Sequence, residues 1–312
     1  MESFHIAVNA VMPFVVYIAF GYLIQRIGIV DETTWDKLNR LVFYCFFPFL
    51  TFNSVYAVSE DYVFDWGFVL LCVLCDLAVI LIVSILVPRF IVDRRKIPVV
   101  VQGIFRSNAV LFAIPLAINL FGDEAASLAG IVITIIVPVY NVVAVVLLEY
   151  YRGANISVPG LIKKILTNPL VDGAVIGILL HELHVVLPTW LMTPVRGIVN
   201  ATTPLALIIL GATLRFAAVR RNLRLVLPTT MIKLVGLPAI MLVFAKLLRM
   251  DPIHLFVFFT LFATPNAVST FTMSAAMGAD GELASHYVMI STVLSGFTLF
   301  LWIFFMKSVG LI

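Results

Sequence analysis

Residues 102–116, QGIFRSNAVLFAIPL, and residues 263–268, ATPNAV, interrupt two long apolar stretches close to their middles. The polar residues at 102–108 are followed by Pro115, and Thr264 and Asn266 flank Pro265, which lacks the backbone N–H that a continuous helix needs. Asparagine is a favoured N-cap, because its side chain accepts a hydrogen bond from a free N–H of the helix that follows. The pattern therefore predicts two broken helices, with Asn108 and Asn266 at matching N-cap positions.

The chain around these interruptions is too apolar for a soluble protein. Of its 312 residues, 62% are hydrophobic and 12% are charged, with a mean hydropathy of +1.12, whereas soluble domains carry about 25% charged residues. A membrane-spanning helix needs roughly 20 mostly apolar residues. The sequence has ten such stretches, at about residues 5–25, 38–57, 64–87, 97–120, 125–149, 166–184, 188–213, 224–248, 253–277 and 285–307. They are too uniformly apolar for the alternating strands of a β-barrel, so we predict an all-α polytopic membrane protein with ten transmembrane helices.

The basic residues predict the orientation of the chain in the membrane. Of the 20 Lys and Arg, 14 follow the odd-numbered stretches and three lie on the opposite side. Because basic loops are retained in the cytoplasm, both termini are predicted to be extracytoplasmic in a plasma membrane, the inner membrane of a bacterium. The net charge of +3 reflects this bias, so no nucleic-acid partner is predicted.

The chain carries the traces of an internal duplication. Four residues recur 156 positions later: Pro13, Gly21, Arg40 and Pro48 return as Pro169, Gly177, Arg196 and Pro204. Asn108-Ala109-Val110 returns as Asn266-Ala267-Val268 after 158 positions. A nearly constant offset over several regions predicts two repeats.

The repeats divide the chain into a first five-helix repeat at 1–150, a short cytoplasmic linker at 151–165 and a second five-helix repeat at 166–312. Since five is odd, the second repeat enters the membrane from the opposite side. Inverted repeats are a hallmark of secondary transporters. Channels and receptors are also built by duplication, so the repeat alone leaves these classes open.

Two facing breaks in the fourth and ninth helices suit an anion. Unwound backbone is costly in hydrocarbon unless it lines a cavity or packs on protein, and each half-helix N-terminus carries about half a positive charge and free N–H groups. Arg106 adds a full charge that matches a carboxylate. The predicted substrate-binding residues are Arg106, Ser107, Asn108, Thr264, Pro265 and Asn266. The alternative is that the breaks are packing kinks and the asparagines only hold helices together.

Asp76 and Lys233 are two further charges at membrane depth. Ionisable groups there are expensive and often functional. One hypothesis is that the two residues pair, or that Asp76 carries a coupling proton. The alternative is a structural charge satisfied by polar neighbours.

No cofactor, metal site or enzymatic centre is predicted. Cys72 and Cys75 are one helical turn apart, but no third or fourth metal ligand accompanies them. His181-Glu182-Leu183-His184 lacks the two residues that the zinc-protease motif needs between Glu and the second His.

The chain resembles the auxin efflux carrier family over essentially its whole length. The resemblance is carried by short motifs: Arg106-Ser107-Asn108 running to Ile114-Pro115-Leu116, Phe121-Gly122, Asn168-Pro169-Leu170, Thr264-Pro265-Asn266-Ala267, Leu283-Ala284-Ser285 and Ser291-Thr292. It implies a fold like that of bile-acid symporters, with the broken helices crossing. It also implies a scaffold of spans 1, 2, 6 and 7, a moving transport domain of spans 3–5 and 8–10 (an elevator mechanism), and a homodimer.

In that family the substrate carboxylate is bound near the residue after each break, which corresponds to Asn108 and Asn266 here. Asp76 resembles an acidic residue near the pathway of the plant carriers. This chain has Ser107 where the plant carriers have Pro, and Asn266 where they have Gln, and its middle loop is short. The resemblance therefore favours a bacterial-type carrier of a small carboxylate over an auxin carrier.

The sequence thus predicts a secondary transporter that carries a small organic carboxylate by alternating access. One alternative is a symporter or exchanger of the same fold, coupled to H⁺ or Na⁺, with an amphipathic or inorganic substrate. Another is a non-transporting membrane sensor, which is disfavoured because no extramembrane domain is evident. The remaining predicted partner is the lipid bilayer.

Overall fold

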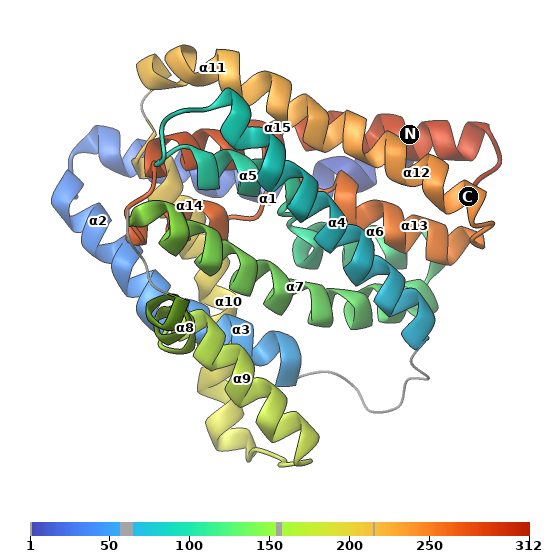
Figure 1. Cartoon of the computed structure of the whole chain (residues 1–312), viewed down its shortest axis with the longest axis horizontal. Helices are drawn as coiled ribbons and strands as arrows, with labels where there is room; N and C mark the ends of the chain where they lie inside the picture. Colours follow the sequence, from blue (N-terminus) through green and yellow to red (C-terminus); the bar gives the residue numbers. More distant parts are fainter. Residues whose placement is uncertain (1, 57–64, 154–157, 215) are drawn as a thin grey trace.

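The described part of the chain is helical throughout. The structure is a computed structural model that describes residues 2–56, 65–153, 158–214 and 216–312, and none of these residues forms a strand. Helices suit a lipid environment, because each backbone N–H finds its acceptor within the same segment. Figure 1 shows the helices packed beside one another, with both ends of the chain on the right-hand side of the view.

The helices follow the predicted apolar stretches closely. In chain order the described elements are α1 (Glu2–Ile27), α2 (Glu32–Leu41), the π-helical segment η1 (Val42–Phe46), α3 (Phe47–Tyr56), α4 (Trp66–Phe90), α5 (Ile97–Phe105), α6 (Ala109–Phe121), α7 (Asp123–Arg152), α8 (Val158–Leu166), α9 (Pro169–Glu182), α10 (Thr189–Ala212), α11 (Phe216–Met231), the π-helical segment η2 (Ile232–Gly236), α12 (Leu237–Leu247), α13 (Pro252–Ala263), α14 (Ser269–Ala276) and α15 (Gly281–Ser308). Each predicted stretch coincides with one helix or with consecutive helices. Residues 57 and 64 of two stretches, and residues 154–157 of the predicted linker, lie outside the described residues.

Six helical segments among the described residues are long and apolar enough to cross a membrane. They are Trp66–Phe90, Ile97–Phe121, Glu124–Arg152, Thr189–Ala212, Asn222–Leu247 and Gly281–Ser308. Met12–Ile27 and Pro252–Ala263 are shorter apolar helices. The prediction of a helical, multi-pass membrane protein is thus supported by length and composition, and the full count of ten spans stays a prediction.

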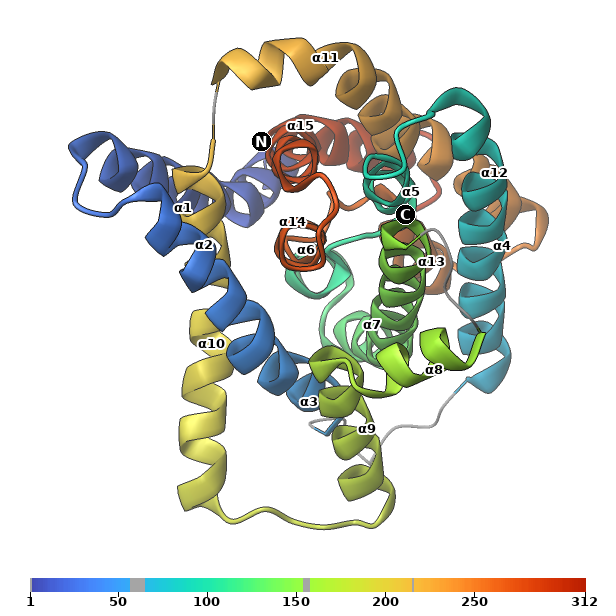
Figure 2. The same ribbon diagram turned by 60° about the vertical axis from the view of Figure 1, so that its left-hand side comes forward.

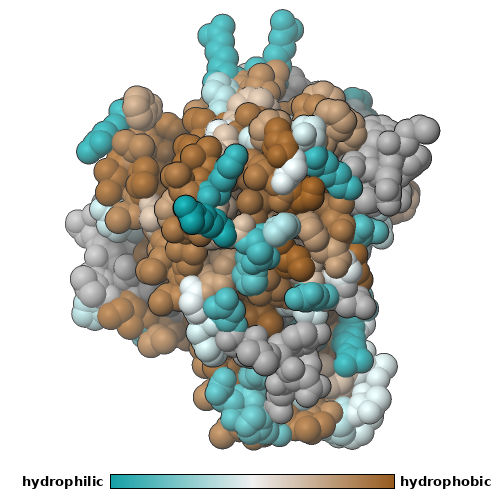
Figure 3. Space-filling model, turned by 90° about the vertical axis from the view of Figure 1, so that its right-hand side faces the viewer, coloured by the Kyte–Doolittle hydropathy of each residue, from teal (hydrophilic) through white to brown (hydrophobic). Residues whose placement is uncertain are grey.

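The surface of the molecule matches a lipid environment. Large apolar side chains are exposed along many helices, as at Phe90, Trp190 and Leu247. On the face seen in Figure 3, apolar side chains predominate and hydrophilic ones are scattered among them. Such a surface would be costly in water but needs no other cover in a bilayer.

Two helix pairs approach each other closely at glycines. α1 packs on α10 and α3 packs on α9 (Figure 2). A Cβ added at Gly21 would lie 1.9 Å from the carbonyl oxygen of Ile208, and one at Gly177 would lie 2.7 Å from that of Phe52. Small residues let helix backbones touch in this way, and such contacts drive helix association in membranes.

The fourth and ninth apolar stretches are both interrupted. α5 ends at Phe105 and α6 begins at Ala109, so three residues between them are not helical. α13 ends at Ala263 and α14 begins at Ser269, with the longer gap in the second half of the chain. The two interruptions predicted from Pro265 and from the polar residues are therefore present.

Candidate functional site

The two helix breaks touch each other. The backbone N–H of Asn108 donates to the carbonyl oxygen of Pro265 over 2.8 Å. In the other direction, the Asn266 side chain donates to the carbonyl oxygen of Gln102 over 2.9 Å. The backbone N–H of Asn266 donates to the Ser291 hydroxyl over 3.0 Å. Backbone groups released by the breaks are thus satisfied across the contact, which explains how unwound chain is tolerated in the apolar interior.

Arg106 lies in the first break and is almost fully buried, with 2% of its surface exposed. Its guanidinium donates to the Gln102 side-chain oxygen over 2.9 Å, to the Met273 sulfur over 3.1 Å and to the Asn141 side-chain oxygen over 2.5 Å. These three bonds use fewer than the roughly five N–H donors that a guanidinium carries. All three partners are neutral, and no carboxylate among the described residues pairs with Arg106. The site therefore holds a buried cation whose negative partner is missing from the chain's described part.

A cavity of about 100 Å³ opens beside this cation. It lies between the pair α3 and α10 on one side and the broken helices with α7 on the other. Its polar lining comes from Thr51, Ser54, Arg106, Ser107, Asn108, Tyr140, Asn141, Thr203 and Ser269. The remaining lining residues are apolar, so a ligand here would meet one full charge and several hydroxyl and amide groups.

The structure divides the six predicted binding residues into two groups. Arg106, Ser107 and Asn108 line the cavity. Thr264, Pro265 and Asn266 do not line it; the last two take part in the contact between the breaks. Instead, Ala267 and Val268 of the second break and Ser269 at the start of α14 line the cavity.

The predicted N-cap position is confirmed for Asn108 and wrong for Asn266, and neither side chain makes the predicted capping hydrogen bond. Asn108 occupies the N-cap position of α6, but its side chain makes no capping hydrogen bond. The N-cap of α14 is Val268, because the chain remains non-helical through Ala267 and the Asn266 amide is engaged by Gln102. The consequence for Asn108 is that its amide faces the cavity without a partner among the described residues.

Asp76 and Lys233 have separate partners. The Tyr140 hydroxyl donates to Asp76, at 3.1 Å from each carboxylate oxygen. The Lys233 ammonium donates to the carbonyl oxygen of Phe105 over 3.3 Å and to the Ser107 hydroxyl. The two charges interact electrostatically, but within the described residues no ion pair joins them directly, so the hypothesis of direct pairing is not supported.

Several contributors were missed at the sequence level. Asn141 and Tyr140 hold Arg106 and Asp76, and Gln102 touches both breaks. A signal for Tyr140 and Asn141 was present, because these adjacent polar residues lie two and three positions after Pro138 in an otherwise apolar run. The contact of Met273 with Arg106 had no such signal, since methionine is ordinary in an apolar helix.

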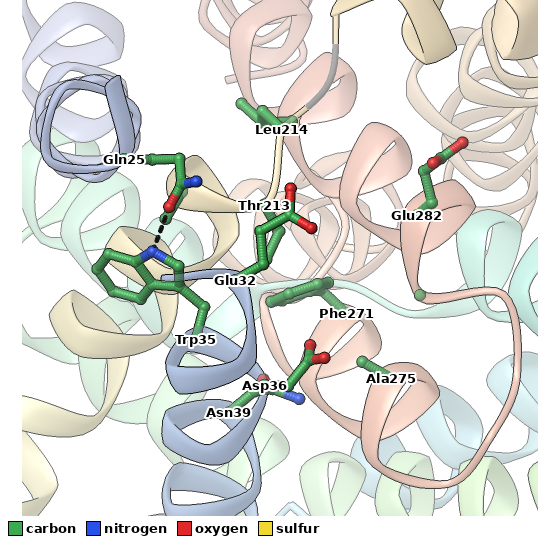
Figure 4. Close-up of a pocket in the computed structure, with 12 residues that line it drawn as sticks. Gln25, Glu32, Trp35, Asp36, Asn39, Thr213, Leu214, Phe271, Ala275 and Glu282 are labelled. Atoms are coloured by element: carbon green, nitrogen blue, oxygen red, sulfur yellow. Dashed lines mark hydrogen bonds between the residues drawn. The ribbon is translucent and has the colours of Figure 1, made fainter. Parts of the chain in front are cut away.

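A second, larger cavity of about 370 Å³ lies at the side predicted to face the cytoplasm. Figure 4 shows Glu32 and Asp36 of α2 opposite Glu282 of α15, with Trp35 donating to Gln25 over 2.5 Å. The two cavities follow one another along α2–η1–α3 and along α14. Within this second cavity's wall the Asn39 side chain donates to the carbonyl oxygen of Thr272 over 3.3 Å, which ties α2 to α14.

Apolar helices around a buried, cationic contact between two broken helices define the chain as a multi-pass helical membrane protein with a polar interior site. Residues 6–303 match the model of the membrane transport protein family, and the chain belongs to that family, the auxin efflux carriers. The resemblance seen in the broken-helix motifs is thereby confirmed.

Two archaeal relatives extend this result. The chain is 23% identical over 308 residues to an uncharacterized transporter of Methanocaldococcus jannaschii, covering 95% of this chain and 98% of the relative. It is 23% identical over 298 residues to an uncharacterized transporter of Methanothermobacter thermautotrophicus, covering 94% of this chain and 96% of the relative. The similarity therefore spans both halves of the chain.

Proposed function

We propose that this transporter carries a small organic carboxylate, bound at the contact between the two breaks. The observation that carries the proposal is Arg106, a buried cation with neutral partners at the wall of a cavity. A buried charge without a counter-charge is strongly unfavourable. An anionic substrate would supply that counter-charge, and a carboxylate matches the planar fork of a guanidinium.

The surrounding charges support an anion of low charge. Ionised Arg106 and Lys233 contribute two positive charges near the breaks, and ionised Asp76 contributes one negative charge. The positive ends of α6 and α14 also point to this region, because both helices begin at the breaks. One carboxylate group would balance the remaining charge.

The proposed architecture is that of two inverted five-helix repeats, 1–150 and 166–312, with spans 1, 2, 6 and 7 as the scaffold. It is supported by a helix contact that occurs twice, at positions that differ by the 156-residue offset between the repeats. Gly21 packs on the carbonyl of Ile208, and Gly177 packs on the carbonyl of Phe52. Gly177 lies 156 positions after Gly21, and Ile208 lies 156 positions after Phe52. The same contact is therefore made twice, and the glycine comes from the first half in one case and from the second half in the other.

Alternating access fits this arrangement. The cavity beside Arg106 is bounded by the scaffold helices α3 and α10 and by the broken helices, so a movement of one group against the other would change which side it opens to. The even number of spans agrees with the position of both chain ends on one side in Figure 1. Extracytoplasmic termini and a homodimer, as in the family, are further expectations of the proposal.

Reconstitution tests the proposal directly. Purified protein in liposomes is expected to take up some member of a panel of labelled carboxylates, namely acetate, lactate, malonate, malate and indole acetate. Uptake should be saturable and should compete with unlabelled substrate. A protein that is monodisperse and stable but transports none of the panel would contradict a carboxylate carrier.

The two asparagines should respond differently to alanine. Asn108→Ala is expected to weaken uptake about 10-fold or more at unchanged thermal stability, because hydrogen bonds to a charged group contribute about 1.5–3 kcal/mol. Asn266→Ala is expected to lower stability as well, since its amide holds the carbonyl of Gln102. Uptake kinetics and melting temperature measured on both variants check the difference, and equal melting temperatures with equal loss of uptake would contradict it.

A proton-coupled symporter is the second candidate, and the observation in its favour is Asp76. This carboxylate is buried and bonded only to the Tyr140 hydroxyl within the described residues. If Asp76 carries the coupling proton, Asp76→Asn is expected to abolish the stimulation of uptake by an imposed pH gradient. A variant with unchanged uptake and unchanged pH dependence would eliminate the proton role.

A further inference from the structure

The larger cavity, beside α2, has a charge pattern opposite to that of the site at Arg106. Its volume of about 370 Å³ lies within the range of sites that hold small molecules. Three carboxylates line it, those of Glu32 and Asp36 in α2 and of Glu282 in α15, and no lysine or arginine among the described residues does. Such a wall disfavours an anion, so the cavity is not suited to hold a carboxylate.

Two polar groups of this wall can receive a ligand. Asp36 is exposed, and its carboxylate makes no hydrogen bond or ion pair within the described residues, whereas Glu32 and Glu282 have interactions of their own. Asn39, three residues after Asp36, is 5% exposed; its side-chain nitrogen donates to Thr272, but its oxygen accepts from no donor in the described chain. Figure 4 shows the two side chains next to each other on α2. A buried oxygen without a donor is costly, and a bound molecule with N–H groups would remove that cost.

Aromatic rings form another part of the wall. Trp35 of α2 and Phe271 of α14 line the cavity, and the indole N–H of Trp35 is held by the Gln25 side-chain oxygen over 2.5 Å. The face of an aromatic ring attracts a cation. No group of three His, Cys, Asp or Glu side chains in the described residues could hold a metal ion. An organic cation with an apolar body therefore suits this wall better than a bare metal ion.

We propose that this cavity binds a small organic ammonium compound. The N–H groups of the ligand donate to the Asp36 carboxylate and to the Asn39 oxygen, and its apolar part lies against Trp35 and Phe271. The inference goes beyond the proposed carboxylate transport, because it assigns a different class of ligand to a different site.

A ligand in this position would also connect two parts of the molecule. Asp36 lies in α2, which belongs to the proposed scaffold, and Phe271 lies in α14, which belongs to the proposed transport domain. A molecule that contacts both opposes the movement of one part against the other. A saturating ammonium ligand is therefore expected to lower the maximal rate of carboxylate uptake, and this consequence alone rests on the proposed function.

The experiment titrates the purified full chain in detergent with benzylammonium chloride and, separately, with benzyl alcohol, an uncharged molecule of the same shape. Melting temperature and tryptophan fluorescence are followed at constant ionic strength. The wild type is expected to respond saturably to benzylammonium and not to the alcohol. Asp36→Asn is expected to bind benzylammonium about 10-fold or more weakly, because a hydrogen bond to a charged group is lost. Its melting temperature without ligand should equal that of the wild type, since Asp36 is exposed.

Asp172→Asn is the matched control, because Asp172 is an exposed carboxylate of α9 outside the cavity lining. It should bind benzylammonium as the wild type does. The proposal is overturned if benzylammonium has no more effect on the wild type than benzyl alcohol, or if Asp36→Asn binds it as tightly as the wild type. The comparison of the two ligands on the wild type is decisive even where a variant does not fold. Both binding readouts are independent of any transported substrate, so a failure of carboxylate uptake is recognised separately.

Discussion

Replacing Arg106 with methionine is expected to abolish carboxylate uptake while leaving the protein at least as stable as the wild type. The guanidinium is the only full positive charge in the cavity lining of the described residues. Removing one member of a buried charged pair costs about 2–5 kcal/mol of binding, which corresponds to roughly 30-fold to several-thousand-fold weaker binding. Arg106→Lys should also be strongly impaired, because an ammonium lacks the planar two-pronged geometry.

Stability should move in the opposite direction from uptake. In the substrate-free protein the Arg106 charge is buried against neutral groups. Its replacement by methionine removes the cost of burying a charge without a counter-charge, and we expect this gain to offset the three hydrogen bonds that are lost. Uptake in liposomes and the melting temperature in detergent give the two readouts. Arg196→Met is a suitable control, since Arg196 is exposed on α10 and lies outside the cavity lining.

Two results would contradict this assignment of Arg106. Arg106→Met with wild-type uptake would place the anion site elsewhere. A large fall in melting temperature would mean that the guanidinium serves mainly to hold Gln102, Asn141 and Met273 together.

Gly211→Ala is expected to disrupt the contact between α1 and α10 and to give the largest loss of stability. A Cβ at Gly211 would lie 2.0 Å from the carbonyl oxygen of Ile18, which is backbone and cannot turn aside. The two helices would have to separate over their whole contact. Overpacking costs typically 1–3 kcal/mol and occasionally more, and we expect about 3 kcal/mol or more, a fall of roughly 5–10 °C in melting temperature.

The same helix provides the matched control. Gly197 also lies in α10, but a Cβ there would meet nothing within 4 Å. Gly197→Ala is therefore expected to be neutral or to stabilise the protein by up to about 1 kcal/mol, since alanine favours the helix. Thermal unfolding and size-exclusion profiles of the two variants test the argument, which fails if both alanines have the same effect.

Sequence reasoning was accurate where the physical signal is local. The ten apolar stretches coincide with helices because the need to satisfy backbone groups in lipid allows an apolar segment little else. The two breaks were found because Pro265 and the clustered polar residues disfavour a helix locally, whereas prolines with apolar residues on both sides, such as Pro115 and Pro138, lie inside helices. The helix caps were predicted less accurately. Asparagine is a favoured N-cap residue, but Asn108 lines a cavity and the Asn266 side chain donates to the distant carbonyl oxygen of Gln102.

By itself, the sequence determined the class of protein, the course of its helices, the family and the positions of the buried charges Asp76, Arg106 and Lys233. Composition and order along the chain are enough for these. The tertiary structure decided which groups those charges meet: that neutral side chains surround Arg106, and that Lys233 binds the end of α5 while Tyr140 bonds Asp76. The physical reason is that such partners come from segments dozens of residues away or more, and only the packing of helices at close glycine contacts sets their distances.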